Sequence, residues 1–333
     1  MSSFKTPTLI RLESAFKNCT SLERIDLRNF NTELVKDLTS LFDNCTSLKS
    51  LDLSNFNTKK VTDFGYFVRN CISLETINLN SFDTSSGIQF FGMFDNCLSL
   101  RSLDLSSFNL ENANNMNSMF YKCESLTSIN MPKISVKKAT GLNNMFSGCS
   151  SLTELDLSKF ETGSATSFGY MFRDCISLKK INLGNWNTKS VKAIHSMFEN
   201  CESLTSIDLS SFDTSNVESL DNLFKNCKSL TSVDLSRFVT NKVTSMSYLF
   251  DNCTSLENID LSNFDSSKTD NMNYMFQNCI KLKSLDLTSF ITKQCSRFTK
   301  MFEGDEGLTL YIKETNNEKL IENLPEYVQC QKN

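Results

Sequence analysis

The sequence predicts an α/β solenoid in which every coil contributes one short strand and one short helical segment. Cysteine recurs every 26 residues without an insertion. A fixed period of this length is the signature of stacked coils that bury their apolar faces against one another. The column consists of Cys19, Cys45, Cys71, Cys97, Cys123, Cys149, Cys175, Cys201, Cys227, Cys253 and Cys279. Two shorter apolar periods inside each coil predict the strand and the helix.

The strand is predicted from an apolar, polar, apolar alternation. In the second coil Leu51 and Leu53 flank Asp52, so the leucines should face the core and the carboxylate should face outward. Stacked in register, such strands form a parallel sheet with a spacing of ~4.8 Å. We expect this sheet on the concave side of the solenoid.

The helical segment is predicted from apolar residues spaced by three, three, one and three, which is typical of one face of a helix. These residues are Val35, Leu38, Leu41, Phe42 and Cys45 in the second coil. We therefore expect short helices on the convex side. Asparagine precedes the cysteine in most coils, as Asn44 does, and it tolerates the left-handed conformation that ends helices.

The repeated aromatic and cysteine positions are interpreted as core. Most of the 27 phenylalanines lie three residues before or eleven residues after the cysteine, which predicts stacked columns rather than a cofactor site. Equivalent cysteines in adjacent coils would lie ~4.8 Å apart with parallel Cβ vectors, a geometry unsuited to disulfides. No C-x-x-C pair is present for zinc. We expect free, buried thiols, with Cys330 as the exposed one.

At this point the residues carry a resemblance. Leu48-x-x-Leu51-Asp52-Leu53 is similar to the core of the leucine-rich repeat, and Phe42-x-x-Cys45-x-x-Leu48 resembles the BspA-like subclass. The match spans residues 4 to 302 and is similar to the 26-residue form found in surface lipoproteins of wall-less bacteria and in protist surface proteins. The resemblance implies a right-handed superhelix and a secreted or surface-attached binding protein. The first residues, MSSFKTPTLIRLES, lack the features of an export signal, so the compartment stays open.

The expected organisation is a leucine-rich-repeat array over residues 1–302, with a half coil followed by eleven 26-residue coils, and a C-terminal cap of strand and helix over residues 303–333. The first strand, Ile25, Asp26 and Leu27, would present an open sheet edge, and open edges invite pairing with another chain. The fifth coil is irregular at Pro132 and Ile134, which predicts a change of curvature there.

Composition narrows the classes of function. A net charge of -4 gives no global field for nucleic acid or anionic membrane, and no apolar run is long enough to span a bilayer. The single histidine, His195, has no paired nucleophile motif, so we expect neither catalysis nor a cofactor or metal. Lysines such as Lys60, Lys138 and Lys242 recur on one lateral loop column, which we interpret as a solubility feature.

The outward column of the strands is the candidate binding surface. Its middle coils alternate Asp with Asn, which relieves repulsion between neighbouring carboxylates. The last four coils do not, and the candidate residues are Asp208, Asp234, Asp260 and Asp286 with Ser206, Ser232 and Ser236. Two functions follow: a binding module for a basic protein or peptide, or an assembly element that forms a homo-oligomer or continues a longer array through the edge at Ile25, Asp26 and Leu27.

Overall fold

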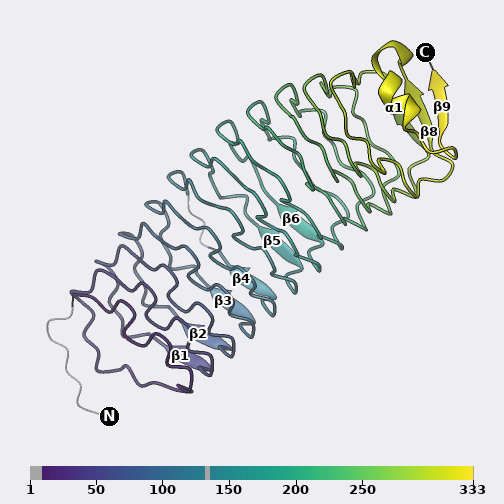
Figure 1. Ribbon diagram of the computed structural model, residues 1–333. Coiled ribbons are helices and arrows are strands. Elements are labelled where there is room, and N and C mark those ends of the chain that lie inside the picture. Colours follow the sequence, from purple (N-terminus) through teal and green to yellow (C-terminus); the bar gives the residue numbers. More distant parts are fainter. Residues whose placement is uncertain (1–9, 132–135, 333) are drawn as a thin grey trace. The chain divides into compact units, whose positions relative to one another are not determined.

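The computed structural model describes residues 10–131 and 136–332. The chain forms two compact units, one ending at Ala165 and one beginning at Thr166, and each is a stack of coils (Figure 1). The strands of the first unit are β1 Ser50–Asp52, β2 Thr76–Asn78, β3 Ser102–Asp104, β4 Ser128–Asn130 and β5 Glu154–Asp156. Those of the second are β6 Lys180–Asn182, β7 Ser284–Asp286, β8 Thr309–Ile312 and β9 Gln329–Lys332.

The strands confirm the predicted alternation. In β1, Leu51 is buried between exposed Ser50 and Asp52. In the first unit, β1 pairs with β2 and β3 with β4, both parallel and shifted by one repeat. A strand in every coil was the wrong expectation, because residues 206–208, 232–234 and 258–260 form no strand. Side chains there still alternate between core and solvent.

The expected convex helices are absent from the described part of the chain, and this prediction was wrong. The helices there are a 3₁₀ turn, η1 Glu314–Asn316, and α1 Glu318–Glu322, both near the C-terminus. The reason is backbone geometry: Ser40 and Asn44 have φ of 56° and 64°, so two residues four apart in this segment are left-handed and interrupt any helix. Asn44 takes the predicted conformation, but no helix precedes it.

In the turn segment, backbone N–H groups donate alternately to a carbonyl of the same turn and to a carbonyl of the next coil. The Leu41 N–H donates to the Leu38 carbonyl within the same turn, whereas the Phe42 N–H donates to the Phe67 carbonyl of the next coil at 2.9 Å. One residue per coil also forms a parallel bridge to the next, as in the series Arg11, Asp37, Asp63 and Gln89. Each unit is therefore a parallel β-solenoid whose coils are joined along the strands and along the turns.

The core confirms the aromatic columns. Phe94 stacks on Phe120 with ring centroids 5.7 Å apart, and Phe250 stacks on Phe276 at 5.6 Å. All of these rings are buried. Offset stacking adds to the apolar burial that drives folding.

The cysteines are free, as predicted, and most of the column is buried. Cys19, in the first coil, is exposed, which corrects the expectation that the entire column is core. Cys330 is half-buried. The buried thiols also do more than fill space: Cys71 donates through Sγ to the Phe42 carbonyl of the preceding coil at 3.2 Å.

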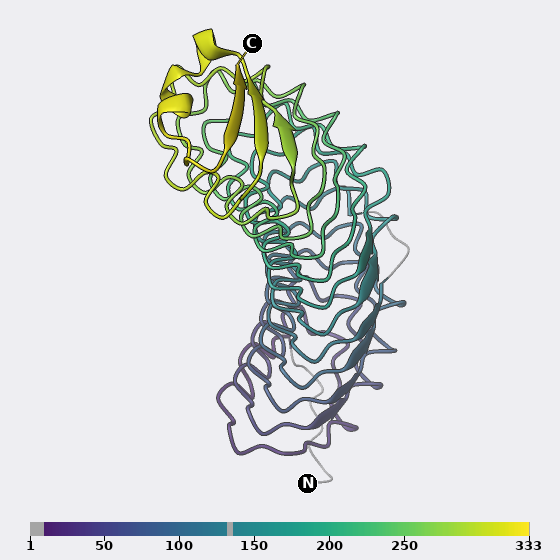
Figure 2. The same cartoon turned by 90° about the vertical axis from the view of Figure 1, so that its right-hand side faces the viewer.

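The C-terminal segment extends the second unit. The strand expected within residues 303–333 is β8, and β9, which the sequence did not reveal, pairs parallel to it; Figure 2 shows β7, β8 and β9 side by side. The expected helix is reduced to α1. The irregularity predicted at Pro132 and Ile134 falls outside the described residues.

Candidate functional site

In the outward column of the first unit, Asp52 and Asp104 each accept a hydrogen bond from an asparagine of the next coil. Asn78 donates its side-chain amide to the Asp52 carboxylate at 3.1 Å, and Asn130 donates to Asp104 at 2.9 Å. The alternation of Asp and Asn therefore supplies a hydrogen bond between coils as well as relief of repulsion.

The second unit lacks this relief in its last coils. Asp208, Asp234, Asp260 and Asp286 occupy the same position of four successive coils, and all four are exposed. Each carboxylate accepts the backbone N–H two residues later, from Ser210, Ser236 and Ser262 at 2.9 Å and from Thr288 at 2.8 Å. We call these four residues the acidic column.

Local hydrogen bonds lower the pKa of three members of the acidic column, Asp208, Asp234 and Asp260. The side chain and backbone of Ser210 lower the pKa of Asp208, although the neighbouring Asp234 charge opposes the shift. The side chain and backbone of Ser236 likewise lower the pKa of Asp234. Stabilising the charged form by hydrogen bonds outweighs the repulsion between neighbours.

The three predicted serines lie on the same face. Ser206, Ser232 and Ser236 are exposed beside the acidic column. Only Ser236 of these three belongs to a turn that caps an aspartate, through its backbone N–H. The structure thus brings the predicted carboxylates and hydroxyls onto one surface of the second unit.

The predicted edge, in the first unit, takes a different form. Ile25, Asp26 and Leu27 form no strand, so the expected strand edge is not there. Leu27 is buried and Ile25 is half-buried. Asp26 pairs with Arg28 at 2.7 Å, and the hydrogen bonds from Arg28 lower the Asp26 pKa to about 2.

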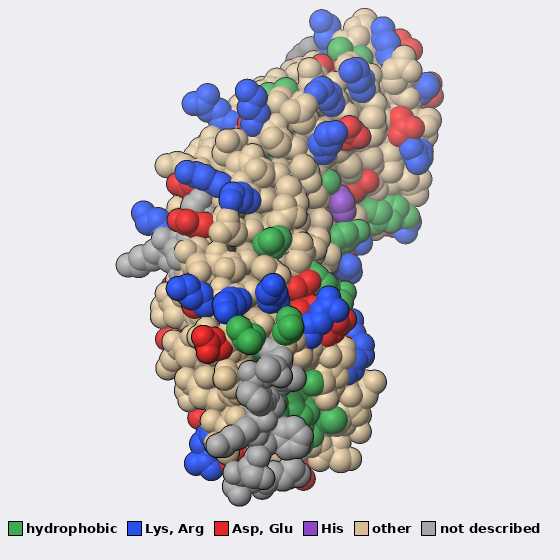
Figure 3. All heavy atoms as spheres, turned by 90° about the vertical axis from the view of Figure 1, so that its left-hand side faces the viewer, with side chains coloured by type: hydrophobic (Ala, Val, Ile, Leu, Met, Phe, Trp, Pro, Cys, Tyr) green, Lys and Arg blue, Asp and Glu red, His purple; other side chains and the backbone are tan. Residues whose placement is uncertain are grey.

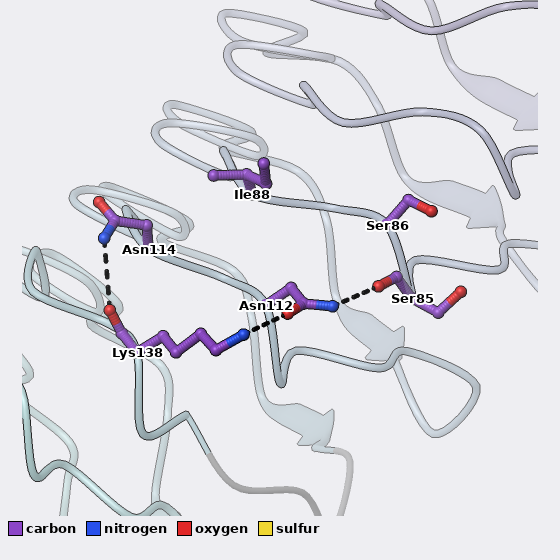
Figure 4. A pocket seen from close by; sticks show the side chains of 6 residues that line it. All are labelled: Ser85, Ser86, Ile88, Asn112, Asn114 and Lys138. Carbon is purple, nitrogen blue, oxygen red and sulfur yellow. Dashed lines mark hydrogen bonds between the residues drawn. The ribbon is translucent and has the colours of Figure 1, made fainter.

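A hollow on the lateral loops of the first unit is drawn in Figure 4. It is lined by Ser85, Ser86, Ile88, Asn112, Asn114 and Lys138. The Lys138 ammonium donates to the Asn112 side-chain carbonyl at 2.6 Å, and the Asn112 amide donates to the Ser85 backbone carbonyl at 2.8 Å. Three successive coils are joined by this chain of bonds.

The second unit repeats that arrangement. Lys242 donates to Asn216 at 2.6 Å, and Asn216 donates to the Lys189 backbone carbonyl at 2.9 Å. On the face drawn in Figure 3, lysine and arginine side chains do not merge into one continuous band. These lateral lysines therefore join neighbouring coils.

The described residues were also compared with the requirements of a metal site, of histidine chemistry and of a membrane span. No group of three or more His, Cys, Asp and Glu side chains there has metal-binding geometry. His195 packs edge-on against the Tyr170 ring, with centroids 4.8 Å apart. No described helix has the length and apolarity that crossing a bilayer requires.

Sequence reasoning missed a charged column on the turn side. Two residues before the cysteines of the first unit, cations and anions alternate through Lys17, Asp43, Arg69 and Asp95. The alternating sign at one fixed position was the available signal, and neighbouring charges do pair: Asp43 binds Lys17 at 3.2 Å and Arg69 at 2.7 Å.

Comparison with solved structures gives bacterial leucine-rich-repeat proteins. A leucine-rich cell surface protein from Faecalibacterium prausnitzii is 17% identical, with 90% of this chain and 77% of that chain covered and a TM-score of 0.43. A leucine-rich repeat protein from Bacteroides ovatus is 18% identical, with 88% and 86% covered and a TM-score of 0.40. A search of curated proteins gives no match.

A protein-family model matches nearly the entire chain. The family described as "Mycoplasma protein of unknown function, DUF285" matches residues 10–132, 126–232 and 218–329, which together span nearly the entire chain. These overlapping matches agree with the repeat period and with the resemblance to proteins of wall-less bacteria. The chain belongs to the DUF285 family, a BspA-like leucine-rich-repeat family.

Proposed function

We propose that this chain is a non-enzymatic protein-binding module, of a surface or adhesive type, which holds a basic segment of a partner on its acidic column. The supporting observation is the run of exposed carboxylates at one position of successive coils, Asp208, Asp234, Asp260 and Asp286. The equivalent aspartates Asp52 and Asp104 of the first unit are instead paired with asparagine amides.

The geometry suits a flexible cationic partner. Each carboxylate is held by a backbone N–H, so little side-chain entropy is lost when a lysine or arginine binds. The like charges of the column repel one another, and a row of cations would relieve that repulsion. Because the column is exposed, binding should be weak for each pair, salt-dependent and additive over several coils.

A labelled octalysine peptide tests the proposal by fluorescence anisotropy. Reversing two central charges, in the double variant Asp234→Lys with Asp260→Lys, should weaken binding by about tenfold and reduce its salt dependence, because each exposed pair contributes ~0.5 kcal/mol and reversal adds repulsion. The matched control is Asp52→Lys with Asp104→Lys. Equal affinity of the wild type and the first variant, or equal losses in both variants, would reject the acidic column as the binding surface.

The assembly alternative is tested independently. It requires contacts at Ile25, Asp26 and Leu27, a segment that forms no strand. Light scattering of the full chain gives its mass in solution, and a multimer that Ile25→Lys dissociates would favour assembly over partner binding. The present geometry favours the acidic column.

A further inference from the structure

We propose that a hollow on the turn side of the first unit binds the cationic side chain of a lysine or arginine from another protein. The hollow lies between adjacent coils, and its lining includes Tyr66, Phe91, Asp95, Asn117 and Ser118. It is separate from the acidic column, which belongs to the second unit.

The charged column of the turn side is paired internally from Lys17 to Arg69. Asp43 is almost fully buried and takes both neighbouring cations: Lys17 lies 3.2 Å from its carboxylate, and the Arg69 guanidinium forms two hydrogen bonds to it at 2.9 and 2.7 Å. Arg69 is therefore turned toward the preceding coil. The carboxylate of the following coil, Asp95, is left without that partner.

The charged column holds no cation on the other side of Asp95 either. The next position of the column is Tyr121. Among the residues that the structure describes, none forms an ion pair or a hydrogen bond with the Asp95 carboxylate. Burial raises the pKa of Asp95 to about 6, while Arg69 and Lys122 pull it down and Asp43 pushes it up. At neutral pH an ionised, poorly solvated carboxylate thus borders the hollow.

In the second unit, the carboxylate equivalent to Asp95 is paired with a lysine of the same protein. There Asp251 corresponds to Asp95, and Lys225 corresponds to Arg69. The Lys225 ammonium lies 3.7 Å from the Asp251 carboxylate and 4.2 Å from the centre of the Tyr248 ring. A lysine held between a carboxylate and an aromatic ring is thus a contact that this fold already builds.

In the first unit Gly92 stands where the second unit has Tyr248. Gly92 is left-handed, with φ of 55°, and a Cβ there would lie 2.6 Å from the Tyr66 ring. The Tyr66 ring therefore occupies the space into which a side chain at Gly92 would extend, and no ring equivalent to Tyr248 stands beside Asp95. Tyr66 packs edge-on against Phe91 at 4.7 Å, so aromatic carbon still borders the hollow.

These groups select for a cation. A carboxylate that lacks a partner forms charge-assisted hydrogen bonds with an ammonium or guanidinium. The Arg69 guanidinium already lies over the Tyr66 ring, 3.9 Å from its centre, so the rings of the hollow supply apolar contact. A neutral amide could donate a hydrogen bond to Asp95 but would bring no positive charge to it, and an anion would be repelled by Asp95. A long lysine or arginine side chain also carries the methylene groups that pack against Tyr66 and Phe91.

The test is a nuclear magnetic resonance titration of the full chain with the capped peptide acetyl-Gly-Arg-Gly-amide. We expect chemical-shift changes at the Gly92 and Ser118 amides, and about tenfold weaker binding in Asp95→Asn, the loss expected for one charge-assisted interaction. Asp251→Asn is the matched control and should leave binding unchanged. Acetyl-Gly-Gln-Gly-amide, which offers an amide without a charge, should bind about tenfold more weakly.

A second variant adds a positive charge beside Asp95. Tyr121→Arg places a cation in the next coil beside Asp95, and it should block the peptide while keeping the carboxylate. Equal binding by Asp95→Asn, equal binding of the glutamine peptide, or no shifts at Gly92 and Ser118 would overturn the proposal. Shifts confined to the acidic column would also overturn it, and would support the proposed function instead.

Discussion

The thiol of Cys227 donates a hydrogen bond to the backbone carbonyl of Phe198, 29 residues earlier in the chain, with Sγ 3.2 Å from the oxygen. The bond joins one coil to the preceding one, and the side chain is fully buried. Cys201, Cys253 and Cys279 repeat it with Phe172, Phe224 and Phe250. The cysteine column is thus a column of weak donors that fixes the stacking of coils.

Thiol reactivity should divide the 13 cysteines sharply. Burial raises the pKa of Cys123 and Cys227, so these thiols should be inert in the folded protein. Cys19 is exposed and should react first with a disulfide reagent, followed by half-buried Cys330. Absorbance of the released thiol, before and after addition of guanidinium, checks this order. Fast reaction of many thiols in native buffer would contradict it.

Removing one donor should cost stability. Cys227→Ala leaves the Phe198 carbonyl without its thiol donor and leaves a small cavity, so the free energy of unfolding should fall by about 1–2 kcal/mol. Urea unfolding followed by circular dichroism measures the change. Cys330→Ala, at a half-buried site in β9, is the control and should change the free energy by less than ~0.5 kcal/mol. A larger loss from the control than from Cys227→Ala would exclude the donor role.

The strand side of each coil was predictable because its pattern has period two. Leu51 and Asp52 alternate between core and solvent, and the same order places Asp234 outward even where the coil forms no regular strand. The core columns followed from the 26-residue period alone. Burial depends on which residues recur, and it does not require knowing the backbone conformation between them.

The turn side was mispredicted because apolar spacing of three and four residues fits more than one backbone. A helix satisfies each N–H four residues back, whereas here the Phe42 N–H reaches the Phe67 carbonyl of the next coil. The left-handed conformation of Ser40 prevents a helix here, and the sequence alone does not identify that conformation at a serine. The Asp95 hollow was missed for the same reason, since it depends on the direction in which Arg69 turns.

Asp305 should make stability depend on pH. It occupies the cysteine position of the last repeat, is buried, and neither carboxylate oxygen has a hydrogen-bond partner among the described residues. Burial raises its pKa from 3.8 to about 7. The folded state therefore holds the proton more tightly than the unfolded state, so stability is highest below pH ~4 and falls as the pH rises through 7.

The variant Asp305→Cys should remove that penalty. It restores the repeat residue, and the gain in melting temperature should be larger at pH 8 than at pH 5, because the buried charge costs on the order of 3 kcal/mol when ionised. Calorimetry at the two pH values measures the difference. Asp286→Asn, on the exposed column, is the control. Equal gains for Asp305→Cys at both pH values would show that Asp305 is not neutral in the fold.

At the end of the array, the Asn317 side chain accepts the threonine hydrogen bond that a backbone carbonyl of the next coil accepts elsewhere. Asn317 is fully buried, and its amide donates to the Phe290 carbonyl at 3.0 Å and to the Lys313 carbonyl at 2.9 Å. Its side-chain oxygen accepts the Thr292 hydroxyl at 3.0 Å. Earlier threonines of this column donate to a backbone carbonyl of the next coil, as Thr240 does to Asp265.

Replacing Asn317 should loosen the C-terminal sheet before the rest of the second unit. Asn317→Ala leaves the Phe290 and Lys313 carbonyls and the Thr292 hydroxyl without these bonds, a loss of about 2–3 kcal/mol. Because coils contact only their neighbours, the effect should stay local. Hydrogen exchange followed by mass spectrometry should show faster exchange in β7, β8 and β9, with coils near Cys201 unchanged.

The control Asn323→Ala removes an exposed side chain that bonds only the Lys319 carbonyl among described partners, and it should leave exchange in the sheet unaltered. Uniformly faster exchange across the second unit would instead mean that it unfolds as one cooperative body.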